Sequence, residues 1–418
     1  MQLEDKEVYA RQFPAHVGVD TAKAFHVLVA RGSDYRRLPP RRVDVSREGF
    51  DAAHQYLQGK FPGVPPEQIL VGMEFAGHHG HTFAAFLKEL GYVVVAVLPM
   101  VTKRHKEDQD NSPLKNDQKD AGLVCKLAGE GKFVGFAQLD VPFCEMRSLA
   151  TQRHRLSVEG VRYRNRLQGL LDVAWPEFSG AFTTIAAPTP LAILRRWPLP
   201  ADLAAASPQA VHALIAKTSR GNYGPEKARA LREEAKRSVG LGNAAEARRR
   251  EIWDVMDRWE LLRTQMKATD DRIEQVVLDY APARALTTIP ELGPVGAATI
   301  LSEMGALHDF VHARQVLKLA GMNLVGSSSA GKDGRRWQSK RGRPLLRKQL
   351  FLLATRWCKK SGLFRVQYEA MVKRNGGSKI KALAALARKL APLILEIAQT
   401  ERSFDHERWA KERRLRSA

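Results

Sequence analysis

The first third of the chain alternates short apolar runs with stretches of helical periodicity. Residues 16–31 form two apolar runs around a polar turn, which predicts a β-hairpin. Residues 46–60 combine an N-cap serine with apolar positions at helical spacing, which predicts a helix. Residues 68–75 and 92–98 are typical of buried strands, and the stretch between them has helical spacing. This alternation predicts an α/β domain with a partly parallel sheet at about residues 14–135.

The middle of the chain, residues 140–284, lacks strand signals. Residues 143–178 and 243–280 carry Arg, Glu, Leu and Gln at helical spacing, which predicts a long antiparallel, coiled-coil-like helical pair. Between them, residues 183–240 begin with a segment that holds five prolines up to Pro208, and a basic stretch interrupted by glycines follows, so we expect a small helical insertion there.

The C-terminal region is expected to be mainly helical. Residues 288–305 (TIPELGPVGAATILSEMG) have the pattern of a helix-hairpin-helix motif, with glycines at the turn. A long polar loop follows between residues 321 and 344. We place a domain at 285–375 and predict that residues 376–418 form a basic helical tail with a frayed end.

Length and charge narrow the class of protein. With 418 residues and 44% hydrophobic residues, the chain is long enough for two or three domains, each with its own core. It has 67 Lys and Arg against 45 Asp and Glu, a net charge of +22, so a polyanion is the natural partner. Three widely spaced cysteines exclude a disulfide framework, and the apolar runs are too short to span a membrane. We therefore expect a soluble, cytoplasmic protein.

Four acidic residues of the first domain are candidate ligands of a hard cation. Asp20 and Glu74 each end a predicted strand, while Asp117 and Asp120 share one face of a predicted helix. Carboxylate oxygens suit Mg²⁺, which can stabilise the attacking and leaving oxygens of a phosphodiester reaction. Taken singly, each acid is more commonly a turn residue or a member of a solvated ion pair. Their order across a β-α-β pattern is the more specific signal.

The C-terminal region carries the candidate nucleic-acid contacts. Glycines at a turn let the backbone approach a phosphate, which the N-terminus of the next helix also attracts. Residues 331–360 contain eleven Lys and Arg and one acid, although such a run can also be a solvated surface. Trp337 could stack on a base or anchor the loop to the core. The candidate nucleic-acid-binding residues are Gly293, Gly296, Lys332, Arg335, Arg336, Lys340, Arg341, Arg343 and Arg347.

Three consecutive serines, Ser327, Ser328 and Ser329, lie in a glycine-rich loop just before this basic run. A hydroxyl among basic side chains can act as a phosphoryl nucleophile, although serines in such loops are mostly spacers.

The opening around Asp20 also looks like the first phosphate loop of the actin and sugar-kinase superfamily. The absence of further glycine-rich nucleotide loops in the later two thirds argues against a kinase.

Taken together, these motifs resemble the DEDD transposases of the insertion-sequence family "one-ten", which includes the Piv-type DNA invertases. Five motifs in the same order carry the resemblance, over about residues 14–135 and 285–375. The segments are Val17–Lys23, Gly72–Gly77, Lys115–Ala121, Thr288–Pro294, and Ser328–Lys332 followed by Ser339–Gly342 and Leu346–Arg347.

The resemblance implies a RuvC-like N-terminal domain with the ribonuclease H fold, a coiled-coil middle and a C-terminal transposase domain with a catalytic serine. Asp20, Glu74, Asp117 and Asp120 would bind Mg²⁺, and the serine would attack a DNA phosphate within one composite site. Ser329 is favoured over Ser328, although the family usually has Ser-Gly where this chain has Ser329-Ala330.

The resemblance also implies partners. Family members use a structured non-coding RNA that pairs with donor and target DNA, and the basic excess is compatible with binding both. Recombining two duplexes requires several active sites, so we expect a dimer or tetramer. Two other classes stay open: a metal-only nuclease of the Holliday-junction type that uses water, and a non-catalytic nucleic-acid binder.

Overall fold

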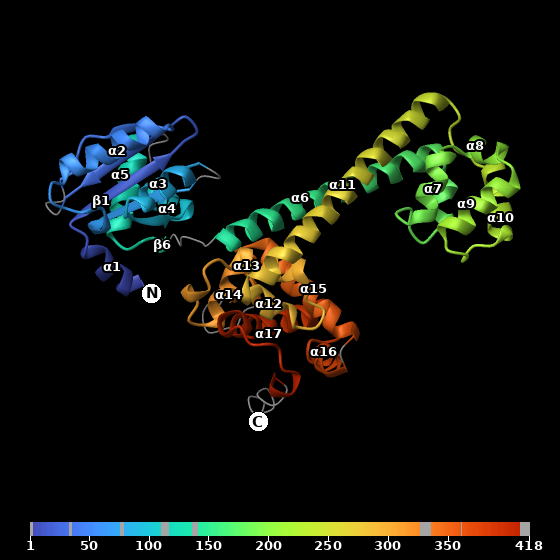
Figure 1. Cartoon of the computed structure of the whole chain (residues 1–418). Coiled ribbons are helices and arrows are strands. Elements are labelled where there is room, and N and C mark those ends of the chain that lie inside the picture. Colours follow the sequence, from blue (N-terminus) through green and yellow to red (C-terminus); the bar gives the residue numbers. More distant parts are fainter. Residues whose placement is uncertain are drawn as a thin grey trace. The chain divides into compact units, whose positions relative to one another are not determined.

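The computed structural model (Figure 1) describes residues 3–32, 36–75, 79–109, 117–135, 141–326, 336–360 and 362–409. The chain divides into two compact units, residues 1–138 and residues 139–418. The first is a mixed α/β unit and the second is mostly helical, as the sequence predicts. None of the described helices is long and apolar enough to cross a membrane.

The first unit is built on a six-stranded sheet of order β3-β2-β1-β4-β5-β6. Strands β1, β4 and β5 are parallel, whereas β2, β3 and β6 are each antiparallel to a neighbour. The strands are β1 Ala15–Thr21, β2 Phe25–Arg31, β3 Arg41–Asp44, β4 Ile69–Glu74, β5 Val93–Val97 and β6 Val134–Gly135. The predicted hairpin and both predicted buried strands are confirmed.

Helices cover both faces of this sheet. Side chains of α2 and α3, such as Phe50 and Phe83, share one core cluster with Val71 and Met73 of β4. On the other face α5 packs through Leu127 against alternate strand residues. The helices are α1 Leu3–Arg11, α2 Arg47–Lys60, α3 His81–Glu89, α4 Pro99–Gln109 and α5 Asp117–Gly129, with a 3₁₀ turn at Pro66–Gln68. Ser46 caps α2 as predicted, since its side chain accepts a hydrogen bond from the Gly49 N–H.

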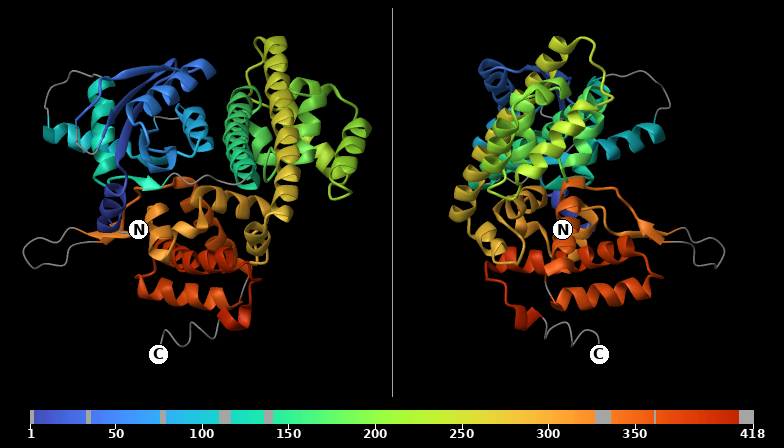
Figure 2. Two further views of the ribbon diagram at one scale, coloured as in Figure 1. Left: turned by 60° about the vertical axis from the view of Figure 1, so that its left-hand side comes forward. Right: turned by 90° about the vertical axis from the view of Figure 1, so that its right-hand side faces the viewer.

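The second unit begins with two long helices, α6 Val141–Ala174 and α11 Ala245–Asp279, which lie side by side in opposite directions (Figure 2). They confirm the predicted helical pair. Between them, four short helices pack with the ends of the pair around Trp175 and Ile193. These are α7 Pro188–Arg196, α8 Pro200–Ala205, α9 Pro208–Thr218 and α10 Pro225–Lys236, preceded by a 3₁₀ turn at Pro176–Ala181. Each starts on a proline, which suits the first helical position because its missing N–H needs no partner there.

The C-terminal helices enclose one core around Leu350, Trp357 and Leu390. They are α12 Ala281–Thr287, α13 Pro294–Met304, α14 Ala313–Leu319, α15 Pro344–Lys360, α16 Gly362–Arg374 and α17 Lys379–Thr400, with a 3₁₀ turn at Leu307–Asp309. Two features differ from the prediction. The expected long polar loop carries two short paired strands, β7 Leu324–Gly326 and β8 Arg336–Gln338.

The basic tail predicted over residues 376–418 is helical over α17, but this helix packs into the core and does not extend from it. Gly376 and Gly377 have φ of +62° and +82°, so they form a turn between α16 and α17. Helix α17 ends at Thr400 and buries Leu386, Leu390 and Ile394 in the core. The charged side chains of α17 therefore lie on the face that points away from the core. The charge pattern alone does not reveal that the opposite, apolar face has packing partners.

Candidate active site

Two of the four predicted carboxylates lie side by side at one edge of the sheet. Asp20 of β1 is in register with Glu74 of the adjacent parallel strand β4. The Thr21 hydroxyl donates a 2.7 Å hydrogen bond to the Glu74 backbone carbonyl and ties the two strand ends together. Since parallel strands end at the same sheet edge, both acids lie where open α/β sheets commonly bind ligands.

A glycine brings the other two carboxylates to this edge. A Cβ atom at Gly18 would lie 2.2 Å from the Ala121 carbonyl oxygen, so only glycine lets α5 approach β1 this closely. Asp120 directly precedes Ala121, and Asp117 lies one turn earlier in α5. The first turns of α5 are thereby held beside β1, in which Asp20 is the last residue but one.

The pKa of Asp20 reflects its burial and the neighbouring acids. Burial is the largest cause that raises the pKa of Asp20 from 3.8 to about 6. The negative charges of Asp120, Asp117 and Glu74 raise it as well, in that order. The structure thus brings Asp117, Asp120 and Glu74 close enough to Asp20 for their negative charges to raise its pKa.

A lysine that the sequence analysis missed supplies positive charge at this cluster. The Lys106 ammonium of α4 lies 2.7 Å from an Asp120 carboxylate oxygen, and Asp120 is only 13% exposed. Lys106 also opposes the upward pKa shift of Asp20. The only sequence signal is the basic stretch 103–106 (KRHK), which precedes the Asp-x-x-Asp pair by about a dozen residues.

The donor set fits a hard divalent cation such as Mg²⁺, because it consists of carboxylate oxygens. Within the described residues, however, no three His, Cys, Asp or Glu side chains are grouped closely enough to hold a metal ion. The Lys106 ammonium occupies one Asp120 oxygen instead. The carboxylates are therefore gathered at one edge without forming a closed set of ligands.

The serine segment lies in the chain between the two short strands β7 and β8. Ser327, Ser328 and Ser329, together with Lys332 and Arg335, lie outside the described residues. The two strands that flank this segment are placed, with Val325 paired to Trp337. The Ser339 hydroxyl donates a 2.6 Å hydrogen bond to the Asn323 side-chain oxygen and joins the strand ends.

The described basic candidates have different environments. Lys340 and Arg341 are exposed, and Arg336 lies on β8. Arg347 instead donates a 2.7 Å hydrogen bond to the Ala320 carbonyl, so its guanidinium supports the backbone. Burial lowers the pKa of Arg343.

Trp337 is 50% exposed, so at least one part of its ring is free of the core. This leaves the indole accessible to a flat partner such as a base. The alternative role, an anchor in the core, would require deeper burial.

The two candidate glycines also differ. Gly293 is the residue before α13, and a Cβ there would meet open space. Gly296 lies inside α13, where a Cβ would come within 2.7 Å of a Leu292 methyl group. The prediction that both glycines form the turn is therefore wrong for Gly296, which allows close packing. The turn itself is held by α15, since the Trp357 indole N–H donates to the Pro290 carbonyl.

Comparison with known proteins gives two family matches. The DEDD-type IS110 model, described as "Transposase", matches residues 17–176, a span that includes all four carboxylates. The model described as "Transposase IS116/IS110/IS902 family" matches residues 283–369, which include the serine segment. An insertion element IS116 uncharacterized 44.8 kDa protein of Streptomyces clavuligerus is 24% identical over 393 residues, covering 93% of this chain and 95% of that protein.

Proposed function

Because the chain belongs to the IS110 family of transposases, which are DNA-transposing enzymes, we propose that it cuts and exchanges DNA strands through its carboxylate cluster and a serine nucleophile. The observation that carries the proposal is the meeting of Asp20, Glu74, Asp117 and Asp120 at one sheet edge. An acid whose pKa is raised by burial and by neighbouring carboxylates, as that of Asp20 is, is typical of functional sites.

In this proposal the four carboxylates hold Mg²⁺, which would stabilise the charge on the phosphate oxygens of the DNA. Asp20 and Glu74 present oxygens from two joined strand ends, and Asp117 and Asp120 present theirs from α5. The strand order β3-β2-β1-β4-β5, antiparallel for the first three strands and then parallel, supports a RuvC-like fold for this unit. Helices α12 and α13 with the turn between them support a helix-hairpin-helix-like role in phosphate contact.

The serine, which we propose to be Ser329 with Ser328 as the alternative, forms a covalent link to DNA. Its oxygen loses a proton and bonds to phosphorus, while the bond from phosphorus to one deoxyribose oxygen breaks and that oxygen takes up a proton. A deoxyribose hydroxyl of a second strand then attacks the same phosphorus and releases the serine. The phosphodiester energy is conserved, so no nucleotide cofactor is consumed.

The proposed partners follow from the charge and the family. We propose that DNA duplexes are the substrate and that a structured guide RNA is a further partner. The protein would act as an assembly of two or four chains. The second unit has 49 Lys and Arg against 28 Asp and Glu, an excess suited to holding nucleic acid. The first unit, which carries the cluster, has 18 against 17.

Covalent trapping tests this proposal. The full-length protein, purified with any RNA that it retains, is incubated with DNA from the ends of the element and Mg²⁺, and adducts are resolved on a denaturing gel. We expect an adduct that Ser329→Ala reduces by roughly 10³-fold or more, while the neighbouring variant Ser327→Ala keeps it. Sequencing the copurified RNA tests the guide: one discrete species supports it.

Three outcomes would contradict parts of the proposal. An adduct that survives in the Ser328→Ala, Ser329→Ala double variant excludes both of these serines as the nucleophile. Nicking that needs Mg²⁺ but leaves no adduct identifies a water-using nuclease. Tight DNA binding without any metal-dependent cleavage identifies a non-catalytic binder.

A further inference from the structure

Lys106 and Asp120 form an ion pair between two different helices of the first unit. The 2.7 Å contact joins α4 to the first turns of α5. Asp120 is 13% exposed and Lys106 is 43% exposed, so the carboxylate has lost most of its water while the lysine stem still reaches solvent. An acid in this position depends on a nearby positive charge.

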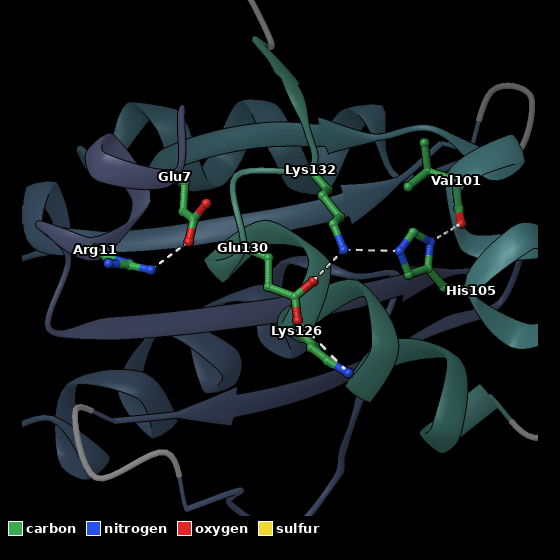
Figure 3. A network of polar contacts seen from close by, with 7 residues as sticks. All are labelled: Glu7, Arg11, Val101, His105, Lys126, Glu130 and Lys132. Carbon is green, nitrogen blue, oxygen red and sulfur yellow. Dashed lines mark hydrogen bonds and ion pairs between the residues drawn. The ribbon is translucent and has the colours of Figure 1, made fainter. Parts of the chain in front are cut away.

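Helix α4 also contacts the residues that follow the C-terminal end of α5. The His105 ring lies 2.9 Å from the Val101 carbonyl oxygen through Nδ1 and 3.0 Å from the Lys132 ammonium through Nε2 (Figure 3). Because an ammonium group can only donate, the contact with Lys132 suits the tautomer in which Nε2 accepts and Nδ1 donates to the Val101 carbonyl. Lys132 also contacts Glu130, 2.7 Å away, just after α5. These bonds fix α4 alongside α5, and Lys106 is the next residue after His105.

We infer that Lys106 is a positioning residue that serves as the resident counter-cation of the cluster and competes with a divalent metal for Asp120. The inference rests on the proposed function, since it requires that the four carboxylates bind metal. The ammonium holds one oxygen of the Asp120 carboxylate, so a metal ion that takes Asp120 as a ligand competes with Lys106 for the same negative charge. The flexible four-carbon stem lets the ammonium leave without moving α4.

This competition has a measurable consequence for metal affinity. Without the ammonium, the acids repel one another and the metal has no competitor. We therefore expect Lys106→Met to bind Mn²⁺ roughly three- to tenfold more tightly than wild type, as expected for one partly exposed ion pair. Lys106→Arg, which keeps the charge, should stay near the wild-type value.

Lys103→Met provides the matched control. Lys103 is on the same helix, is exposed and carries the same charge, but it takes part in no ion pair of the described residues. Its replacement changes the net charge of the unit equally, so we expect less than a twofold change in Mn²⁺ affinity. Circular dichroism confirms that each variant is folded.

The experiment is a Mn²⁺ titration of the full-length, nucleic-acid-free protein, followed by the electron paramagnetic resonance signal of free Mn²⁺. The Asp20→Asn, Asp120→Asn double variant measures binding outside the cluster. Tighter binding by Lys106→Met than by Lys103→Met supports the inference. Equal binding by these two variants overturns it, while wild-type binding above the double variant leaves the proposed metal site intact. Wild-type binding no greater than that of the double variant overturns the metal site and the inference together.

Discussion

At the scale of single residues, Asp20 shows how the carboxylate cluster lowers the stability of the fold. Its pKa is raised from 3.8 to about 6, so the folded protein holds this proton more tightly than the unfolded chain does. The contribution of Asp20 to stability is therefore fully present below about pH 4 and is lost as the pH rises through 6. Ionisation of Asp20 therefore lowers the stability of the fold, and the negative charge that it creates attracts cations.

We expect Asp20→Asn to raise the free energy of unfolding in metal-free buffer at pH 7 by about 1–2 kcal/mol, after allowing for the partial exposure of the side chain. The asparagine is similar in shape and carries no charge at any pH. The difference between variant and wild type should shrink towards zero below about pH 4. Urea unfolding with EDTA at a series of pH values checks this, and a difference that does not change with pH would contradict it.

Other residues show that the same residue type has different roles in different places. Arg347 lies in the basic run that predicts phosphate contacts, but its guanidinium donates to the Ala320 carbonyl. Gly296 lies in the glycine pattern of a turn, but it lets Leu292 pack against a helix. Neither role follows from residue type, because it depends on which atoms are within reach after folding.

At the scale of elements, the site depends on how closely one helix approaches one strand. Gly18 and Gly72 lie on neighbouring strands and both face α5. At Gly18 the nearest α5 atoms are backbone atoms of Ala121 and Cys125, which cannot move aside as a side chain can. The spacing between α5 and β1 therefore sets the spacing between the Asp-x-x-Asp pair and Asp20.

We expect Gly18→Ala to destabilise the protein by about 1–3 kcal/mol or more and to weaken Mn²⁺ binding, because the added methyl group pushes α5 away from β1. Thermal unfolding and Mn²⁺ titration measure the two effects. Gly59→Ala is the matched control, since its added methyl group meets no atom within 4 Å and it lies in helix α2. It should be neutral or slightly stabilising. Equal effects of the two variants would show that packing against α5 is unimportant.

At the scale of the whole molecule, charge is divided unevenly between the two units. Of the net +22, the first unit accounts for +1, from 18 basic and 17 acidic residues. The second accounts for +21, from 49 and 28. A nearly neutral unit carries the acid cluster, and a strongly basic unit supplies long-range attraction for DNA.

Salt dependence of DNA binding tests this division. We expect the Arg341→Gln, Lys348→Gln double variant to reduce the slope of log K against log salt concentration by about 1.8, since each lost phosphate contact contributes about 0.9. The control is Arg41→Gln, Lys60→Gln in the first unit, where both side chains are also exposed. Fluorescence anisotropy with a labelled duplex at several salt concentrations gives the slopes. A larger change in the control would place the main DNA contacts on the first unit.

The sequence alone determined much of this protein. Local periodicity, capping residues and prolines predicted the hairpin, α2, β4, β5 and the long helical pair, because these signals act over a few residues. The order of Asp20, Glu74, Asp117 and Asp120 also selected the acids that the fold brings together.

Only the tertiary structure decided how these parts meet. The pairing of Lys106 with Asp120, the close approach of α5 at Gly18 and the burial of α17 all depend on atoms far apart in the sequence. Strands β7 and β8 pair only because residues on both sides of the serine segment meet. Such contacts are set by packing and exclusion of water over the whole unit, whereas a pattern within a short segment records only which face of an element is apolar.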